Sequence, residues 1–473
     1  MYFSILLLFL IGSCHNTQAE NNSEYLIDMT FGGYGNGRGQ FNYPVCVALD
    51  HNNNIYVTDW ENDRIQVFDN DGELIKIIPD DESNFQIDSP VGIALDGDGN
   101  MIIVEQHNHR LHKISADGKS IQVFGEEGNN PGEFDNPRGI ALDDDNNIYV
   151  VDTGNNRVQV LSKEFEVLYT FGREGMGDGE FYSPRGVAVD ENGNIYIADT
   201  FHHQVQIFNE KGQFIRRIGN SGNGPGEFNG TRYIAIDRNN NIYVTDYRNG
   251  KVVQFDSEYN FVNEFGNSEQ EEVNLTYPEG IVIGPRGYIY VADAGNNRIV
   301  RYSTSKIIIN KKLGTDYIEK EQWDEAIQSF EKVLDEDPDD FQTRKAIAFA
   351  YFESGQINKA IDEYSIILQE FPQDQNIESK IIDAHYVLAT EYTRSGHYKE
   401  ALSHYKKVMD IQPDYPEVKK NYYLNYLKYI YNSIFFRIFI IVLLIVIIVV
   451  FVIPRIFRKK KKGGKHYRGR NRF

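Results

Sequence analysis

The sequence predicts two folded parts of different class, an all-β six-bladed propeller followed by an all-α helical solenoid, and then a single transmembrane helix. Three observations lead to this prediction. A unit of 46 or 47 residues recurs six times in the first two thirds of the chain, a second unit with a shift of 34 residues follows it, and an apolar run of twenty residues stands near the C-terminus. Repeat periods in this range are typical of propellers and solenoids.

The first period appears in segments such as "PRGIALDDDNNIYVVDTGNNRVQVL" (137–161) and "PRGVAVDENGNIYIADTFHHQVQIF" (184–208). Each unit holds four short runs rich in Val, Ile, Tyr and Phe, separated by Asn, Asp and Gly turns, and this pattern predicts four strands. Four strands repeated radially make one blade of a propeller. We therefore expect six blades over about residues 25–302.

An acidic residue ends the second expected strand of every unit. These residues are Asp59, Glu105, Asp152, Asp199, Asp246 and Asp293. In "DTGNNR" (152–157) the residue belongs to the Asp-Thr-Gly tripeptide that aspartic proteases place at a catalytic carboxylate. Such a protease needs a second Asp-Thr-Gly, and the chain has no other. We therefore expect these carboxylates to accept turn amides and to pair with the residue five positions later. Those partners are Arg64, Arg110, Arg157, Gln204, Lys251 and Arg298.

The six units resemble the NHL-repeat family, whose members form six-bladed propellers. The resemblance covers roughly residues 25–302, and it implies the fold more strongly than a function, because propellers host binding modules and enzymes alike. No fourth strand follows the sixth unit, whereas "YLIDMTF" (25–31) precedes the first. We predict that residues 25–31 complete the last blade and leave no open edge.

The second period begins with "LGTDYIEKEQWDEAIQSFEKVLDEDP" (313–338) and repeats in "AFAYFESGQINKAIDEYSIILQEFP" (348–372). After a seven-residue insertion it returns as "LATEYTRSGHYKEALSHYKKVMDIQP" (388–413). The spacing of the Ala, Tyr, Phe and Pro residues resembles three tetratricopeptide repeats over about 307–415. The resemblance implies paired helices, and the predicted helix over 416–432 caps the stack, so this part extends over 307–432.

A predicted transmembrane helix follows as "IFFRIFIIVLLIVIIVVFVI" (434–453), which is long enough to cross the hydrocarbon core of a bilayer. The tail over 454–473 has ten Lys or Arg residues and no acidic residue. By the positive-inside rule this tail is cytoplasmic, and anionic lipid is its expected contact. We therefore predict a single-pass protein of the plasma membrane with an extracytoplasmic propeller and helical solenoid.

The N-terminus fits this orientation. "MYFSILLLFLIGSCHNTQAE" (1–20) has an apolar run followed by small residues, which predicts a signal peptide over residues 1–19. "IGSC" resembles a bacterial lipobox with Cys14 as the lipidated residue, "TQA" offers an ordinary cleavage site after Ala19, and an uncleaved anchor is the third alternative. Cys14 and Cys46 are the only cysteines, so no disulfide framework is expected.

Candidate binding residues were sought where the units depart from their own pattern. The second residue of each inner strand, at the expected mouth of the central channel, is Val45, Val91, Arg138, Arg185, Arg232 or Glu279. The three arginines form one arc of the ring, with Glu279 next to them. Either each arginine pairs with a local carboxylate, or the arc binds an anionic group of an acidic peptide, a uronic-acid glycan or an acidic partner loop.

Histidines also break the pattern, at His107, His109, His112, His202 and His203. "DTFHHQVQIF" (199–208) looks like a strand of the propeller lyases that mature amidated peptides, and two histidine clusters suggest zinc. No histidine occupies a channel-mouth position, so we expect solvated turn residues, no metal and no cofactor.

The overall charge is −21, and removing the ten positive charges of the tail leaves about −31 for the rest of the chain. This excess of negative charge argues against nucleic acid as a partner. The sequence predicts a membrane-anchored extracytoplasmic scaffold that binds proteins or peptides, with an anionic glycan as a second ligand class. The alternative is a propeller hydrolase or lyase with a metal site in the channel, and we expect a binding protein rather than an enzyme.

Overall fold

The computed structural model describes residues 25–80, 83–267, 274–284 and 287–452 of the 473-residue chain. It divides into two compact units, Met1–Ile308 and Ile309–Phe473. The expected signal segment with Cys14 and the basic tail over 454–473 lie outside the described residues.

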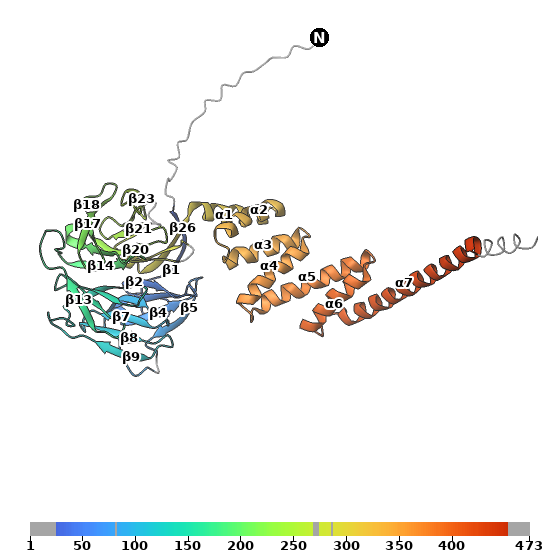
Figure 1. The fold of residues 1–473 in the computed structure, drawn as a ribbon, viewed down its shortest axis with the longest axis horizontal. Helices are drawn as coiled ribbons and strands as arrows, with labels where there is room; N and C mark the ends of the chain where they lie inside the picture. Colours follow the sequence, from blue (N-terminus) through green and yellow to red (C-terminus); the bar gives the residue numbers. More distant parts are fainter. Residues whose placement is uncertain (1–24, 81–82, 268–273, 285–286, 453–473) are drawn as a thin grey trace, which may run out of the picture. The chain divides into compact units, whose positions relative to one another are not determined.

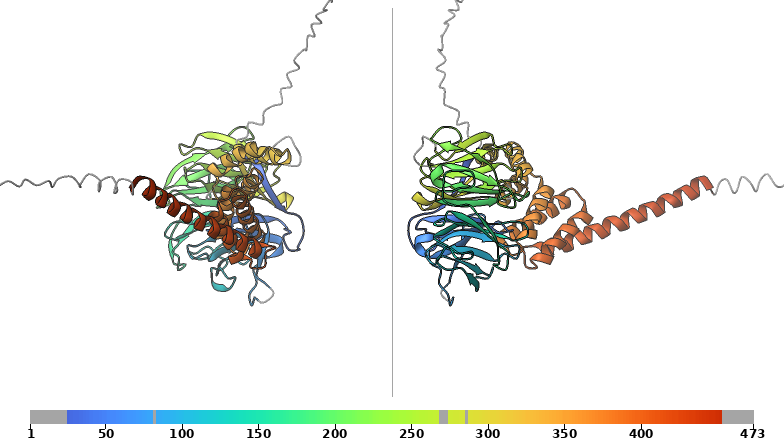
Figure 2. Two further views of the ribbon diagram at one scale, coloured as in Figure 1. Left: turned by 90° about the vertical axis from the view of Figure 1, so that its right-hand side faces the viewer. Right: turned by 60° about the vertical axis from the view of Figure 1, so that its left-hand side comes forward.

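The first unit is a six-bladed β-propeller in which each blade is a four-stranded antiparallel sheet, as predicted (Figures 1 and 2). The innermost strands are β2 (Pro44–Leu49), β6 (Pro90–Leu95), β10 (Pro137–Leu142), β14 (Pro184–Val189), β20 (Thr231–Ile236) and β24 (Pro278–Ile283). The second strands are β3 (Ile55–Asp59), β7 (Met101–Glu105), β11 (Ile148–Asp152), β15 (Ile195–Asp199), β21 (Ile242–Asp246) and β25 (Ile289–Asp293). Every residue of these second strands is buried, because each blade packs between two neighbours.

The outer half of each blade holds a third and a fourth strand. The third strands are β4 (Arg64–Phe68), β8 (Arg110–Ile114), β12 (Arg157–Leu161), β16 (Gln204–Phe208), β22 (Lys251–Phe255) and β26 (Arg298–Thr304). The outermost strands are β5 (Leu74–Ile78), β9 (Ser120–Phe124), β13 (Val167–Phe171), β17 (Phe214–Ile218), β23 (Phe261–Phe265) and β1 (Tyr25–Gly32). Short parallel strands β18 (Asn220–Ser221) and β19 (Glu227–Phe228) pair in one linker. Single 3₁₀ turns occur at η1 (Trp60–Asn62), η2 (Thr200–His202) and η4 (Ala294–Asn296).

The N-terminal strand closes the ring, as predicted. β1 pairs with β26 in antiparallel register, so the last blade has the strand order β1-β26-β25-β24. Asp28 on β1 accepts a hydrogen bond from Arg301 Nε on β26 at 2.6 Å, and both side chains are more than nine-tenths buried. The guanidinium of Arg301 also lies 4.6 Å from the ring centre of Tyr288. A buried ion pair thus joins the two ends of the propeller sequence.

The repeated carboxylates hold their hairpins, and the interpretation of Asp152 as a structural residue is supported. Asp152 Oδ1 accepts from the amide of Asp135 at 2.7 Å, and Asp152 Oδ2 accepts from Arg157 Nε at 2.8 Å. The predicted acid–arginine pair forms at 2.7–2.9 Å in four blades: Arg64–Asp59, Arg110–Glu105, Arg157–Asp152 and Arg298–Asp293. In the fourth blade Gln204 Nε2 donates to Asp199 at 3.1 Å. The fifth blade departs from the prediction, because Lys251 pairs with Glu264 at 2.7 Å.

The second unit contains paired antiparallel helices of the tetratricopeptide type. Its helices are α1 (Ser305–Glu319), α2 (Trp323–Glu336), α3 (Phe341–Glu353), α4 (Ile357–Glu370), α5 (Gln375–Arg394), α6 (Tyr398–Ile411) and α7 (Val418–Ile447), followed by the π-helical turn η5 (Ile448–Val452). Ala326, Ala360 and Ala401 are fully buried at the close contacts. A Cβ at Gly314 would lie 2.4 Å from the Phe330 ring, so only glycine permits this approach.

The seven-residue insertion before the third repeat lengthens a helix. α5 has 20 residues where the equivalent α3 has 13. Seven residues add about two turns of α-helix, so the buried face of α5 keeps its orientation along the added length. Asp374 caps the extended end and accepts from the amides of Asn376 and Ile377.

Candidate ligand-binding site at the propeller mouth

The structure brings the four candidate residues together. Arg138, Arg185, Arg232 and Glu279 lie on β10, β14, β20 and β24, inner strands that contact one another in this order. Each inner strand has an irregular register between its first and fourth residues, for example between Pro137 and Ile140. The candidate residues therefore lie within bulges, which redirect side chains away from regular alternation.

One carboxylate serves two of the three arginines. Arg232 Nε lies 3.3 Å from Glu279 Oε1, and Arg185 Nη1 lies 3.9 Å from the same oxygen. Glu279 is 2% exposed. Arg138 forms no ion pair with any described residue. The alternative in which each arginine pairs with a local carboxylate therefore holds for Arg185 and Arg232, which share Glu279, and not for Arg138. The arc of Arg138, Arg185 and Arg232 contains three cations beside this one anion.

Burial increases the effect of this imbalance. The Nε atoms of Arg138 and Arg185 and the Oε2 atom of Glu279 are buried and have no hydrogen-bond partner within the described part of the chain. Burial and the neighbouring charge of Arg138 lower the pKa of Arg185 to about 10. Arg185 remains protonated at neutral pH, so the arc keeps its positive charge. Such groups bind anions and do not act as general bases.

Aromatic residues fix one end of the arc. The guanidinium of Arg232 lies 3.9 Å from the ring centre of Tyr247, and Tyr247 stacks on Tyr277 at 4.7 Å. The Tyr43 hydroxyl lies 3.1 Å from that of Tyr247 and donates to Glu279 Oε1 at 3.4 Å. Burial and the charge of Glu279 raise the pKa of Tyr43. Arg232 is therefore held in place, while Tyr277 remains 47% exposed.

The sequence interpretation overlooked these aromatic residues, although a signal existed. Tyr43 and Tyr277 precede the opening proline, where other blades have Ser, Asn or Gly. Tyr247 follows the hairpin acid, where three other blades have Gln or Thr. The same departure from the repeat pattern that identified the arginines would have identified them.

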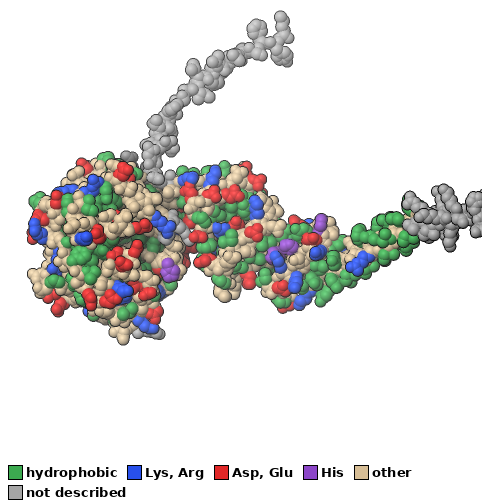
Figure 3. All heavy atoms as spheres, viewed as in Figure 1, with side chains coloured by type: hydrophobic (Ala, Val, Ile, Leu, Met, Phe, Trp, Pro, Cys, Tyr) green, Lys and Arg blue, Asp and Glu red, His purple; other side chains and the backbone are tan. Residues whose placement is uncertain are grey.

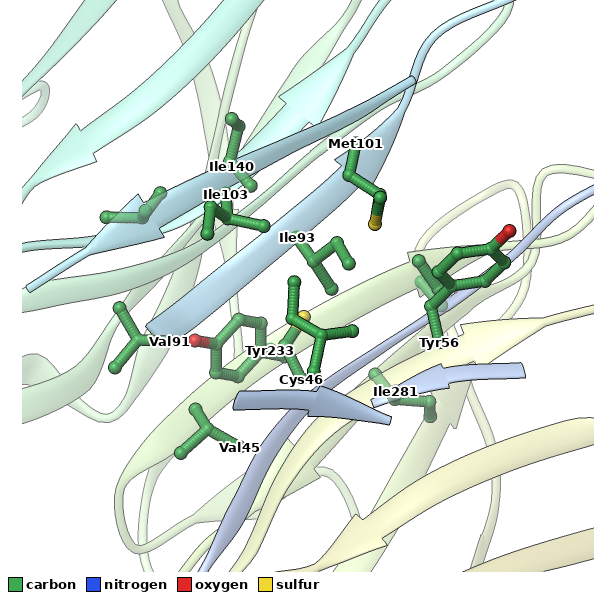
Figure 4. Packing of buried hydrophobic residues seen from close by; sticks show 14 of the residues in the cluster. Val45, Cys46, Tyr56, Val91, Ile93, Met101, Ile103, Ile140, Tyr233 and Ile281 are labelled. Atoms are coloured by element: carbon green, nitrogen blue, oxygen red, sulfur yellow. The ribbon is translucent and has the colours of Figure 1, made fainter. Parts of the chain in front are cut away.

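Tyr233 follows Arg232 and packs against the inner strands of other blades. Its position, third in the inner strand, is glycine in four blades, and a Cβ at Gly139 would lie 2.2 Å from the carbonyl oxygen of Arg185. Tyr233 is 6% exposed and packs with Val45, Cys46 and Val91 from the first two blades (Figure 4). The ring of Tyr233 therefore joins the fifth blade to the first two within one apolar cluster. Burial raises the pKa of the Tyr233 hydroxyl.

The histidines lie apart from the arc in separate local contacts. His107 Nδ1 is 2.7 Å from Ser89 Oγ, and His202 Nδ1 is 2.7 Å from Asp199. His112 lies on β8 and is 1% exposed, with Glu105 and Ser120 each 2.7 Å from its ring nitrogens. The expectation of a solvated turn residue is wrong for His112. The described ranges contain no group of three or more His, Cys, Asp or Glu side chains placed to hold a metal ion.

Known families match both parts of the chain. The NHL repeat matches residues 41–68, 134–161 and 275–302, and a 6-bladed beta-propeller family matches residues 190–267. Two tetratricopeptide repeat families match residues 317–380 and 382–415. The chain carries NHL repeats and tetratricopeptide repeats. No curated protein matches the whole NHL and tetratricopeptide chain or a part of it.

Several solved propellers are similar to the NHL part at low identity. A streptogramin B lyase is 13% identical with a TM-score of 0.44, and the match covers 59% of this chain and 98% of the lyase. A virginiamycin B lyase from Staphylococcus aureus is 16% identical with a TM-score of 0.41, and the match covers 57% of this chain and 82% of the lyase. A protein of unknown function from Bacteroides thetaiotaomicron is 18% identical with a TM-score of 0.48, and the match covers 59% of this chain and 75% of that protein. These values imply nothing about the ligand or activity of this chain.

Proposed function

We propose that this protein is a membrane-anchored extracytoplasmic scaffold whose propeller mouth binds an acidic segment of a partner protein. NHL and tetratricopeptide repeats are typical protein-interaction modules. The helix over Val418–Phe451 is long and apolar enough to cross a membrane, and none of its most apolar stretch is buried. The ten positive charges that follow favour a cytoplasmic tail, with the propeller and the repeats on the other side.

The charge imbalance of the arc carries the ligand proposal. Three neighbouring guanidinium groups share one carboxylate that pairs with only two of them, although the whole chain has a net charge of −21. Adjacent buried cations repel one another unless an anion joins them. Guanidinium groups bind carboxylates with paired, charge-assisted hydrogen bonds, so a ligand carboxylate compensates the arc.

The exposed aromatic surface beside the arc favours a peptide as the source of that carboxylate. Tyr277 presents an exposed ring that is already stacked on Tyr247. Rigid tyrosines supply contact area at protein interfaces with little loss of side-chain entropy. An acidic residue next to an apolar residue therefore fits the mouth, with the carboxylate on Arg138 and Arg185 and the apolar side chain on Tyr277.

Binding of a hexaglutamate peptide to the detergent-solubilised full chain tests this proposal. Arg138→Gln with Arg185→Gln removes two charges but keeps the Arg232–Glu279 pair, and we expect at least a tenfold loss of affinity with little change in melting temperature. Lys163→Gln with Lys211→Gln is the matched control, because it removes two exposed charges that contact only neighbouring Glu164 and Glu210. Equal affinity of the two double variants would refute the site. Tighter binding of oligogalacturonate than of hexaglutamate would identify a glycan ligand instead.

A further inference from the structure

The start of α7 contacts the helical stack partly through polar side chains. Asn425 is 2% exposed and accepts a hydrogen bond from Thr393 Oγ1 at 3.0 Å. Asn421 Nδ2 donates to the Tyr386 hydroxyl at 3.1 Å, and the Lys428 ammonium lies 5.7 Å from the ring centre of Tyr398. The contacts of α7 with the stack combine these polar groups with two apolar residues, Val418, which is fully buried in the first turn, and Tyr422, which packs against the same cluster.

Most of the remaining surface of the same segment is apolar and exposed. Six side chains form it, and we call them the aromatic collar: Tyr423 (65% exposed), Leu424 (47%), Tyr426 (46%), Leu427 (64%), Tyr429 (40%) and Tyr431 (67%). Figure 3 shows this apolar surface continuing along α7 into the apolar run. The last helix of a soluble helical solenoid has a polar outer face. The exposed apolar side chains of α7 indicate that a partner covers its outer side.

Helix geometry places the collar at the edge of a bilayer. α7 is continuous from Val418 to Ile447, so the collar and the apolar run share one axis. From Lys428, which still contacts α6, to Ile434, where the apolar run begins, the helix rises by about 9 Å. The headgroup layer of one leaflet is roughly 5–8 Å thick. The collar therefore reaches into this layer, where tyrosines are enriched in membrane proteins.

The charges beside the collar favour lipid over a second copy of α7 as its partner. Residues 418–452 contain Lys419, Lys420, Lys428 and Arg437 but no Asp or Glu. A second copy of α7 would bring these like charges together, whereas a lipid surface adds no net positive charge. We infer that the aromatic collar is a lipid-contact surface whose C-terminal end, Tyr429 and Tyr431, lies in the headgroup layer, and that it holds the third tetratricopeptide repeat against the bilayer. This inference rests on the proposed membrane anchoring.

Depth-dependent quenching in vesicles tests the inference on the full chain. Single cysteines are introduced as Leu427→Cys, Tyr431→Cys, Ile440→Cys and Lys332→Cys in a Cys14→Ser, Cys46→Ala background and labelled with an environment-sensitive fluorophore. The vesicles contain phosphatidylcholine with a fifth of phosphatidylserine, and a spin label is placed either at the headgroup or in the middle of the acyl chain. We expect the headgroup label to quench positions 427 and 431 at least twofold more than the acyl-chain label does. Position 440 should be quenched more by the acyl-chain label than by the headgroup label. Exposed position 332 on α2 should be quenched by neither label.

Each other outcome contradicts a different statement. Quenching at 440 without quenching at 427 and 431 overturns the collar as a lipid contact and leaves the anchoring intact. Absence of quenching at 440 overturns the anchoring itself. Efficient disulfide formation between two copies at position 427, with no quenching there, would show that a second copy covers the collar.

Discussion

Arg232 Nε lies 3.3 Å from Glu279 Oε1, and this contact joins the inner strands of the fifth and sixth blades at the propeller mouth. Because Arg232 is also stacked on Tyr247, it belongs to the framework of the site. Arg185 reaches the same oxygen only at 3.9 Å, and the buried Nε atoms of Arg138 and Arg185 have no partner among the described residues. The three arginines of the arc therefore differ in role, and replacing all three together would confuse loss of binding with loss of stability.

Glu279→Gln should separate stability from binding. The substitution leaves Arg232 buried without a counter-ion, so we expect the free energy of unfolding to fall by about 3 kcal/mol. It also leaves the arc more positive, so hexaglutamate affinity should rise roughly tenfold, equivalent to about 1.4 kcal/mol. Urea denaturation and calorimetric titration measure the two effects, with exposed Glu210→Gln as control. A loss of stability with unchanged affinity would show that the arc is purely structural.

Asp28→Asn should weaken the closure of the ring. It removes the buried partner of Arg301, and we expect a loss of about 3 kcal/mol in the free energy of unfolding. Asp117→Asn removes an exposed pair with Lys119 and should leave stability unchanged. Deletion of residues 25–31, which uncovers the backbone of β26, should be more damaging and cause aggregation. Equal denaturation curves for Asp28→Asn and Asp117→Asn would mean that this pair contributes nothing to closure.

Gly139→Ala tests the close approach of the inner strands. The added Cβ would lie 2.2 Å from the carbonyl oxygen of Arg185, a backbone atom that cannot move without its strand. Overpacking of this kind costs about 1–3 kcal/mol, which a thermal melt of the full chain detects. In Gly177→Ala the new methyl meets only the flexible side chain of Glu180, at 3.0 Å, and should be tolerated. Similar melting temperatures for the two variants would contradict the tight inner ring.

The third tetratricopeptide repeat should lose stability in acid. Burial, together with the charges of Lys407 and His404, lowers the pKa of His385 to about 4. The unfolded chain takes up this proton near pH 6.5, before the folded chain does, so stability is present above pH 6.5 and falls as the pH drops towards 4. Between pH 7.5 and 4.5 we expect a loss of about 2.5 kcal/mol. Circular dichroism of helix unfolding measures this pH dependence. His385→Gln should reduce it, whereas His397→Gln, at an exposed position, should leave it unchanged.

The proposed orientation predicts opposite protease sensitivity for the two ends of the chain. A tag placed after Phe473 should be protected in intact spheroplasts, and the propeller should be cleaved by added protease. The physical reason is the cluster of ten positive charges that retains the tail on the cytoplasmic side. A cleaved tag with a protected propeller would reverse the orientation.

The repeat pattern was sufficient for the fold because strand and helix formation depend on neighbouring residues. Six agreeing units predicted the four-stranded blades, and the unit count predicted that residues 25–31 pair with the last blade, as β1 does with β26. The acid–arginine hairpin pairs were equally predictable, since the partners stand five residues apart. The predicted hairpin pair was wrong in the fifth blade, where Lys251 pairs with Glu264 on the outermost strand instead.

The sequence by itself determined the number of blades, the helical repeats and the place of the arginines in one arc, because each follows from local periodicity. Only the tertiary structure decided which arginine is compensated, that Tyr233 packs against the first two blades and that Asn425 of α7 is buried against the stack. Arg232 meets Glu279 across 47 residues of chain, and Tyr233 contacts Val45 and Val91 from the first two blades. Such partners come together only when the inner strands close into a ring, because charge pairing and burial depend on distances in space and not on spacing along the chain.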